Sequence, residues 1–375
     1  MLPAIPANFG RLTDVFASAL GAIRGVDNRL QFRPARRVIA VLVDGLGAHN
    51  LKAAGGHAPF LNSALAKTKT IACGFPSTTA TSITSFATGL NAGTHGLLGY
   101  KLYDRTDGVA FNLLNGWDSV RTPEVWQPHE TVSERAIGAG IGAYVVGPKA
   151  YEGSDFTRAT MRGAKYIAGR TISDRFELAG DLLRHDRGDW LTYLYVPELD
   201  QIAHSQGVAS MAWLAALEDL NAAVAGLAAR LAKTDALLLT ADHGVIDVKP
   251  HQQIMLDEVE IAWSDVAAVA GDPRVNYLYL NEGAKRAEIA QSLQEALGES
   301  ALVLESEAII DAGWFGAVSE SSFARLPELF VLGVKNVALY HREHAPMASL
   351  NMIGQHGGLN PTEMTVPLLG FGAFA

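Results

Sequence analysis

The segment RRVIAVLVDG, residues 36–45, is a short apolar run that ends in an acidic turn. Its aliphatic residues follow one another without polar alternation, which is typical of a strand buried on both faces of a parallel sheet. Three more runs have this character: AYVVGP (143–148), WLTYLYVPELD (190–200) and ALLLTADHG (236–244). We therefore predict a core built from buried, parallel strands.

Helical patterns separate these predicted strands. The clearest is MAWLAALEDLNAAVAGLAARLA, residues 211–232, in which apolar residues recur at steps of three and four. Alternating strands and helices favour an α/β fold with an open, mostly parallel sheet and right-handed crossovers.

The pattern changes after His251. Four segments then read as strand, helix, strand and strand: VNYLYL (275–280), GAKRAEIAQSLQEALG (283–298), ALVLES (301–306) and LFVLGVKNVALYH (329–341). We interpret residues 255–345 as a small α+β insert. It would separate the first part of the α/β core, residues 1–254, from a return to the core over residues 346–375.

Composition and charge exclude several classes of protein. With 39 acidic and 30 basic residues the net charge is −9, which argues against a protein that coats nucleic acid. Cys73 is the only cysteine, so no intramolecular disulfide forms, as is usual in a reducing compartment. The N-terminus lacks the pattern of a signal peptide, and no uninterrupted apolar run is long enough to cross a bilayer. We expect a cytoplasmic protein without a membrane span.

Acidic residues end three of the predicted strands. Asp44, Asp200 and Asp242 each follow an apolar run, although they lie far apart in the chain. A single Asp before a turn is ordinary. Because neighbouring parallel strands end at a common edge, where α/β sheets bind their ligands, we expect the three carboxylates to converge there.

Histidines accompany these acids at spacings that suit metal binding. His204 follows Asp200 by four residues and shares its face if a helix begins there, His243 follows Asp242 directly, and His356 stands between glycines. Each motif alone has an ordinary explanation as an ion pair, a helix cap or a turn. Together they favour a metal site, and carboxylate with imidazole suits Zn²⁺, with Mn²⁺ next.

A hydroxyl-rich segment, GFPSTTATSITSFATGLNAGTHG, covers residues 74–96. It resembles a loop entering a helix, and a helix N-terminus offers free N–H groups to a phosphate. A threonine hydroxyl is a weak nucleophile that a metal ion can activate. Most hydroxyls in the segment are interpreted as caps or as bonds back to the helix: Ser77, Thr81, Ser82 and Thr84.

In their order, these motifs resemble the alkaline phosphatase superfamily, and most closely its type I phosphodiesterase/nucleotide pyrophosphatase branch. The resemblance extends from about residue 36 to residue 370 and rests on strand-Asp-Gly, a Pro-flanked Thr, Thr-Gly-Leu…His-Gly, Asp-x-x-x-His, Asp-His-Gly and a late His-Gly. It implies a three-layer core with a mostly parallel central sheet and a variable insert.

The resemblance also implies roles for particular residues. Asp44, Asp242 and His243 would hold one metal ion together with the nucleophile, and Asp200, His204 and His356 would hold the second. In the family the nucleophile precedes the Thr-Gly-Leu turn by nine residues, and counting back from Thr88 gives Thr79. Thr78 remains the fallback, because Phe75-Pro76 precedes the candidate here instead of following it.

One departure from the family bears on the substrate. Diesterase members usually carry an Asn shortly after the His-Gly turn, where it binds a phosphoryl oxygen. Tyr100 and Lys101 occupy that place here, and either side chain can donate to such an oxygen.

The implied activity is hydrolysis of a phosphodiester or pyrophosphate bond at two metal ions, through a phosphothreonyl intermediate. A phosphomonoesterase or a phosphonate hydrolase would use the same ligands, and a non-catalytic sensor of metal or phosphate ligands is the alternative from another class. The expected partner is a small phosphorylated molecule, with a nucleotide as one option. Trp117, Trp126 and Tyr151 either stack on its base or pack in the core.

Overall fold

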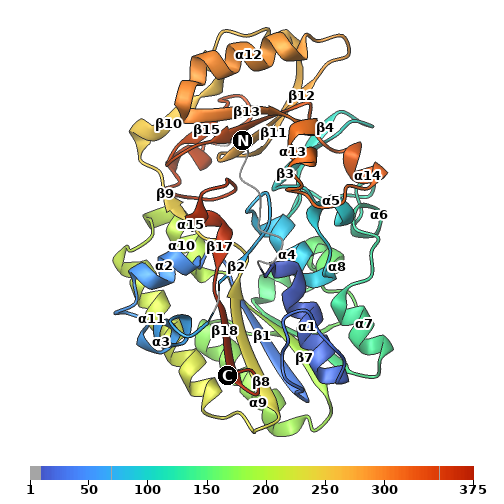
Figure 1. The fold of residues 1–375 in the computed structure, drawn as a ribbon, viewed down its shortest axis with the longest axis vertical. Helices are drawn as coiled ribbons and strands as arrows, with labels where there is room; N and C mark the ends of the chain where they lie inside the picture. Colours follow the sequence, from blue (N-terminus) through green and yellow to red (C-terminus); the bar gives the residue numbers. More distant parts are fainter. Residues whose placement is uncertain (1–9, 69, 346) are drawn as a thin grey trace.

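The computed structural model of the protein describes residues 10–68, 70–345 and 347–375. Its centre is a six-stranded sheet in the order β18-β8-β1-β7-β5-β6 (Figure 1). The strands are β1 (Arg37–Val43), β5 (Gly142–Gly147), β6 (Lys165–Ala168), β7 (Trp190–Val196), β8 (Asp235–Ala241) and β18 (Leu368–Gly372). All are parallel except β18, which runs antiparallel to β8. The predicted α/β fold with a mostly parallel sheet is confirmed.

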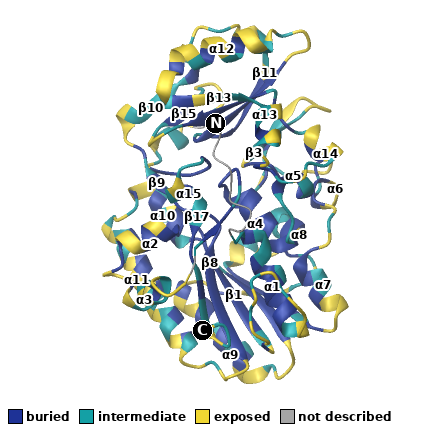
Figure 2. Ribbon diagram, in the orientation of Figure 1, coloured by how far each residue is buried: buried dark blue, intermediate teal, exposed yellow. Residues whose placement is uncertain are grey.

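Helices cover both faces of this sheet, which explains why its central strands are apolar throughout. On one face lie α1 (Leu12–Arg24), α4 (Thr79–Thr88) and α7 (Val132–Gly138). On the other lie α3 (Pro59–Leu65), α9 (Ile172–His185) and α11 (Met211–Ala228). Every residue of β8 is buried, and Figure 2 shows the central strands as the most continuously buried part of the core. The result is the predicted three-layer core.

Helix α11 is, among the described residues, the one helix long and apolar enough to cross a membrane by length and composition. Core helices of soluble proteins pass the same test, so the signal is weak. The helix packs against α3, α9 and α10 (Glu198–Gln206) and buries Trp213, Leu217 and Leu220. The absence of a membrane span stays a prediction, which this packing favours. The predicted absence of a signal peptide concerns a segment whose residues 1–9 lie outside the described part.

A second, antiparallel sheet lies at the far end of the molecule, in the order β11-β12-β14-β13 (Figure 1). Its strands are β11 (Val266–Asp272), β12 (Val275–Leu280), β13 (Ala301–Glu305) and β14 (Leu329–Gly333). Side chains alternate along β12: Leu278 joins the cluster under α12 (Arg286–Leu297), whereas Tyr277 and Tyr279 point to the other face of the sheet, where they contact Leu98 and Tyr103. Strands β10 (Gln253–Met255) and β15 (Ala338–Tyr340) pair where the chain enters and leaves. The division at residues 254 and 345 stays a prediction.

The hairpin between β11 and β12 is fastened to the core by a buried ion pair. Arg274 donates from Nη2 and Nε to the two carboxylate oxygens of Glu363, at 2.9 and 3.1 Å, and both side chains are fully buried. Glu363 in turn accepts the backbone N–H of Gly358 at 2.9 Å. A bidentate Arg–carboxylate pair fixes orientation as well as distance. The hairpin tip is therefore held against the loop that carries His356.

Candidate metal and phosphoryl-transfer site

The three predicted carboxylates meet at one edge of the central sheet. Asp44 follows β1, Asp242 follows β8, and Asp200 lies in α10 directly after β7. Because β8, β1 and β7 are neighbours in the sheet, their ends deliver these side chains to one place. Asp44 is 4% exposed, Asp200 7% and Asp242 0%, so all three carboxylates are withdrawn from water.

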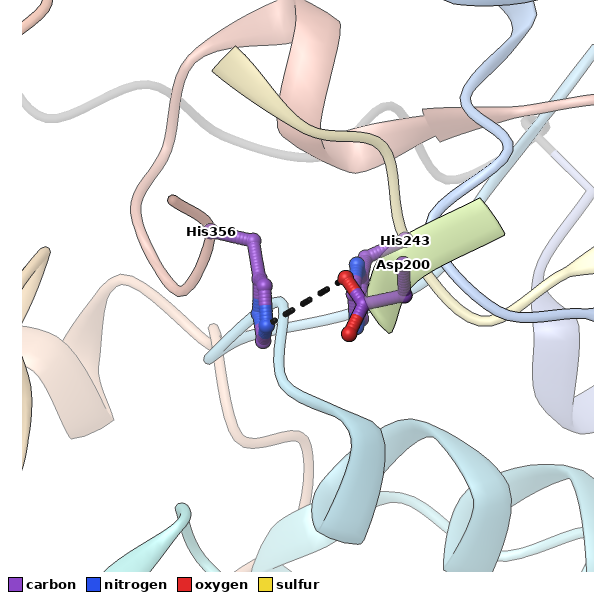
Figure 3. Close-up of side chains that lie close together, drawn as sticks. All are labelled: Asp200, His243 and His356. Carbon is purple, nitrogen blue, oxygen red and sulfur yellow. Dashed lines mark ion pairs between the residues drawn. The ribbon is translucent and has the colours of Figure 1, made fainter. Parts of the chain in front are cut away.

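The histidines complete two adjoining groups around these acids. Nε2 of His243 lies 3.4 Å from Oδ1 of Asp44 and 3.5 Å from Oδ2 of Asp242. Nε2 of His204 lies 3.0 Å from Oδ2 of Asp200. Nε2 of His356 lies 3.9 Å from Oδ1 of Asp200, and Figure 3 shows this contact as a dashed line. The rings of His243 and His356 stack with centroids 3.7 Å apart, which brings the two groups into contact.

Backbone carbonyls orient all three imidazoles in the same way. Nδ1 of His204 lies 2.8 Å from the carbonyl of Gly354, Nδ1 of His356 lies 3.0 Å from that of Ser77, and Nδ1 of His243 lies 3.3 Å from that of Gly244. A carbonyl accepts only, so each Nδ1 carries the proton. Each Nε2 is then a bare acceptor that faces the carboxylates, which is the usual arrangement of a metal-binding histidine.

Several carboxylate oxygens at this site have no hydrogen-bond partner. Oδ1 of Asp44, Oδ1 of Asp200 and Oδ2 of Asp242 are buried and accept no hydrogen bond. A buried, unpaired carboxylate oxygen is costly unless a cation compensates it. Ligand atoms of Asp44, Asp242 and His243, and of Asp200, His243 and His356, lie within 4.8 Å of one another. The two buried groups therefore fit a pair of divalent metal ions, with His204 beside the second group.

Thr79 is the first residue of α4, and its hydroxyl faces this site. Oγ1 of Thr79 lies 3.1 Å from Nε2 of His243. The hydroxyl of Thr78 instead donates to Oγ1 of Thr81 at 3.2 Å, and Thr81 donates to the carbonyl of Leu97 at 3.0 Å. Of the two neighbouring threonines, only Thr79 thus presents its hydroxyl to the acids and imidazoles.

The remaining hydroxyls of the segment have mostly structural partners. Ser77 donates to the carbonyl of Gly358 at 2.8 Å, and Thr84 donates back to the carbonyl of Ala80 at 2.6 Å. These bonds agree with their interpretation as contacts that shape the helix and the adjoining loop. Ser82 is buried without a hydrogen-bond partner.

A cavity of about 560 Å³ opens from the metal site, and both sheets contribute to its walls. Asp44, Thr79 and Asp200 line it, as does Tyr100. Lys101, the first residue of β3 (Lys101–Asp104), lines a separate, smaller cavity of about 200 Å³ instead. Of the two residues predicted to meet a phosphoryl oxygen, the structure places Tyr100 in the main cavity and Lys101 beside it.

Tyrosines from the central sheet and a nearby loop form an aromatic wall in the main cavity. The wall, as defined here, consists of Tyr151, Tyr166, Tyr193 and Tyr195. The rings of Tyr151 and Tyr195 lie 5.9 Å apart, and the hydroxyl of Tyr195 donates to Asp44. Trp117 and Trp126 pack on Phe111 instead and do not line this cavity.

Asp272, which the sequence motifs did not predict, also lines the cavity. It is the last residue of β11, 8% exposed, and its Oδ2 has no hydrogen-bond partner. Burial raises its pKa to about 8, which His204 and the backbone N–H of Tyr100 only partly offset. The signal was present in VAAVAGD, residues 266–272, an apolar run that ends in an acid as Asp44 and Asp242 do.

Removal of the metal ions is expected to make the protein less stable as pH rises from about 6.5 to 8. Without a cation, burial, and then repulsion from Asp200, raise the pKa of Asp242 to about 7, and burial raises that of Asp272 to about 8. The folded chain then binds more protons than the unfolded chain in this window. Each excess proton lowers the free energy of unfolding by about 1.4 kcal/mol per pH unit.

The opposite contribution of His243 is confined to lower pH. Burial lowers the pKa of His243 to about 3 from 6.5, so its effect on stability ends above pH 6.5. Thermal unfolding of the chelated protein at pH 6.5 and pH 8 measures the change, with the metal-loaded protein as control. A melting temperature that rises across this window without metal would contradict the assignment.

The fold and the site together place the chain in a class, the metal-dependent hydrolases of phosphoryl esters. A narrower assignment comes from a family profile, type I phosphodiesterase/nucleotide pyrophosphatase, which matches residues 38–359. The chain belongs to this family, and the resemblance inferred from its motifs is confirmed. A search of curated protein sequences finds no significant match.

Solved structures show the same fold at low sequence identity. Murine ectonucleotide pyrophosphatase/phosphodiesterase 5 is 17% identical, with a TM-score of 0.69 and coverage of 89% of this chain and 88% of its own. An inactive variant of it in complex with AMP is 16% identical, with a TM-score of 0.70 and coverage of 90% and 88%. Phosphonoacetate hydrolase from Sinorhizobium meliloti 1021, in complex with phosphonoacetate, is 21% identical, with a TM-score of 0.67 and coverage of 90% and 91%.

Proposed function

We propose that this protein hydrolyses small phosphodiesters through a phosphothreonyl intermediate on Thr79. The observation that carries the proposal is the position of the Thr79 hydroxyl, 3.1 Å from Nε2 of His243 and beside unpaired, buried carboxylate oxygens. A non-catalytic sensor would need the ligands but not a hydroxyl directed at them. The presence of Thr79 there favours the enzyme.

The residues divide into two ligand sets. Asp44, Asp242 and His243 would hold one metal ion with Thr79, and the second set is Asp200, His204 and His356. Zinc is proposed because carboxylate and imidazole ligands suit it, with manganese as the second choice. When bound, the two ions supply positive charge that lowers the pKa of a hydroxyl and stabilises developing negative charge on oxygen.

Thr79 carries the covalent step. Its Oγ1 releases a proton and forms a bond to phosphorus, while the bond from phosphorus to the leaving ester oxygen breaks and the alcohol departs. Water then attacks phosphorus, the bond to Oγ1 breaks, and a phosphomonoester leaves as Thr79 regains its proton. The start of α4 favours an anion because helix N-termini present free N–H groups and a positive dipole end.

The charge of the cavity favours a diester over a monoester. Among the described residues that line it there is no lysine or arginine. A phosphomonoester carries close to two negative charges at neutral pH and a diester carries one, so the monoester gains more from an additional cation. The same reasoning disfavours the carboxylate of a phosphonoacetate-like substrate.

A comparison of bis(p-nitrophenyl) phosphate with p-nitrophenyl phosphate tests this proposal. For the zinc-loaded or manganese-loaded protein we expect the kcat/KM of the diester to exceed that of the monoester by at least about tenfold. This factor corresponds to roughly one negative charge of the monoester that no lysine or arginine among the described cavity residues offsets. A higher kcat/KM for the monoester would identify a phosphomonoesterase. No turnover of either ester with a full complement of metal would favour the sensor.

The aromatic wall is proposed to receive an apolar or aromatic ester group. The four tyrosine rings, of which Tyr193 is buried and the others are half-buried, provide a large contact area for such a group. The AMP complex of the murine relative supports a nucleotide as one form of it. A cytoplasmic location is also proposed, supported by Cys73 as the only cysteine.

A further inference from the structure

The insert contributes one acidic side chain, Asp272, to the wall of the main cavity. Asp272 ends β11, and Pro273 and Arg274 form the turn into β12. Arg274 is locked to Glu363 by the fully buried ion pair described above. The glycine after His356 accommodates the hairpin: Gly357 has φ 122°, and a Cβ there would lie 3.2 Å from Cβ of Asp272. Asp272 is therefore held rigidly beside the metal site.

The carboxylate of Asp272 interacts electrostatically with His204 but pairs with no lysine or arginine in the described part of the chain. Its Oδ2 is buried and accepts no hydrogen bond, and no ion pair joins it to a described Lys or Arg side chain. Lys101 lines the adjoining cavity together with Asp272, yet the two form no ion pair. A positive partner from outside the chain would favour the ionised form of this buried side chain, because a nearby cation stabilises a carboxylate.

The net charge of the site with metal ions and substrate bound also favours a positive charge near Asp272. Two divalent ions, if held here, would be balanced by the three ligand carboxylates and an ionised oxygen of Thr79. A phosphodiester then adds one negative charge, and Asp272 adds another. A substrate that carried its own positive charge near Asp272 would offset the second of these.

We infer that the substrate is a phosphodiester with an ammonium group on one ester arm, and that Asp272 binds this group. The ammonium binds the carboxylate of Asp272 where this residue lines the cavity, while the other ester arm lies toward the aromatic wall on the central sheet. This assignment rests on the proposed diester hydrolysis and adds the chemical class of its substrate. It makes Asp272 a determinant of specificity supplied by the insert.

Two matched esters test the inference. p-Nitrophenyl 2-aminoethyl phosphate and p-nitrophenyl n-propyl phosphate differ by an ammonium in place of a methyl group. In the metal-loaded native protein we expect the aminoethyl ester to have the higher kcat/KM by at least about tenfold, with the gain mainly in KM. Asp272→Asn should remove this preference and leave the kcat/KM of the propyl ester within a few-fold of its native value.

Binding measurements separate this inference from the hydrolytic proposal. Calorimetry with the same esters, on metal-loaded Thr79→Ala and on Thr79→Ala combined with Asp272→Asn, reports the preference without relying on turnover. Glu305→Gln serves as a control, since Glu305 lies on the same insert sheet but pairs with Arg286 away from the cavity. Metal content is measured for every variant.

Each outcome has a defined meaning. Tighter binding of the aminoethyl ester that depends on Asp272 supports the inference, even if the native protein turns over neither ester and the hydrolytic proposal fails. Equal binding of both esters by the protein with Asp272 intact overturns it. So does a preference that survives Asp272→Asn, or an Asp272→Asn variant that weakens both esters equally, which would indicate a structural role.

Discussion

Thr79→Ala is expected to abolish diester hydrolysis, with a fall in kcat of at least about 10⁴-fold, as is typical when a covalent nucleophile is removed. The variant loses the one hydroxyl that lies against Nε2 of His243. The carboxylates and imidazoles of both ligand sets remain, so the metal content should be largely kept. Steady-state rates with bis(p-nitrophenyl) phosphate and metal analysis of the same sample measure the two effects.

Two controls sharpen this experiment. Thr78→Ala removes the neighbouring hydroxyl, which is committed to Thr81, and should keep most of the activity. Thr79→Ser keeps a nucleophilic hydroxyl at the first position of α4 and should keep measurable turnover. Near-native rates in Thr79→Ala together with inactive Thr78→Ala would transfer the nucleophilic role to Thr78.

The second large effect is expected from His204→Ala. His204 lies 3.0 Å from Asp200, and its Nδ1 is fixed by the carbonyl of Gly354, so its loss leaves Asp200 and His356 to hold the second ion. We expect the metal content to fall from about two ions per chain toward one. The corresponding fall in kcat/KM is on the order of 10³-fold, because one metal ion contributes several kcal/mol to transition-state stabilisation.

His57→Ala is the matched control for this variant. His57 is an exposed histidine that pairs with Glu218 at 2.7 Å and does not line the main cavity. Both metal ions and the activity should be unaffected. If His204→Ala kept two tightly bound ions per chain and native activity, the second ligand set would be wrongly assigned.

Local sequence patterns predicted the buried strands of the central sheet and the acidic residues at their ends. Asp44 and Asp242 are recognisable because each ends an apolar run. Parallel strands share one edge of the sheet, which predicts from the sequence alone that the two side chains lie close together. Asp200 and His204 needed only helical spacing. Thr79 needed more, since the residues alone left several hydroxyls open and the family spacing reduced them to one candidate and a fallback.

The substrate end of the site depends on tertiary contacts that no local pattern encodes. Asp272 reaches the cavity because Arg274 pairs with Glu363, which lies 89 positions further along the chain. The aromatic wall similarly joins Tyr151 from a loop to Tyr193 on β7. Lys101 and Tyr100 are adjacent in sequence, yet Tyr100 lines both cavities and Lys101 lines only the smaller one. Sequence spacing cannot distinguish such neighbours.

Titration of the metal-free protein with Zn²⁺ or Mn²⁺, followed by the rate of bis(p-nitrophenyl) phosphate hydrolysis, tests the central claim most directly. A phosphodiesterase built on two buried Asp/His groups should be inactive after chelation and should reach a plateau of activity at two ions per chain. A protein that bound two ions without turnover, or that hydrolysed the diester equally well after complete chelation, would contradict the assignment of a two-metal phosphodiesterase.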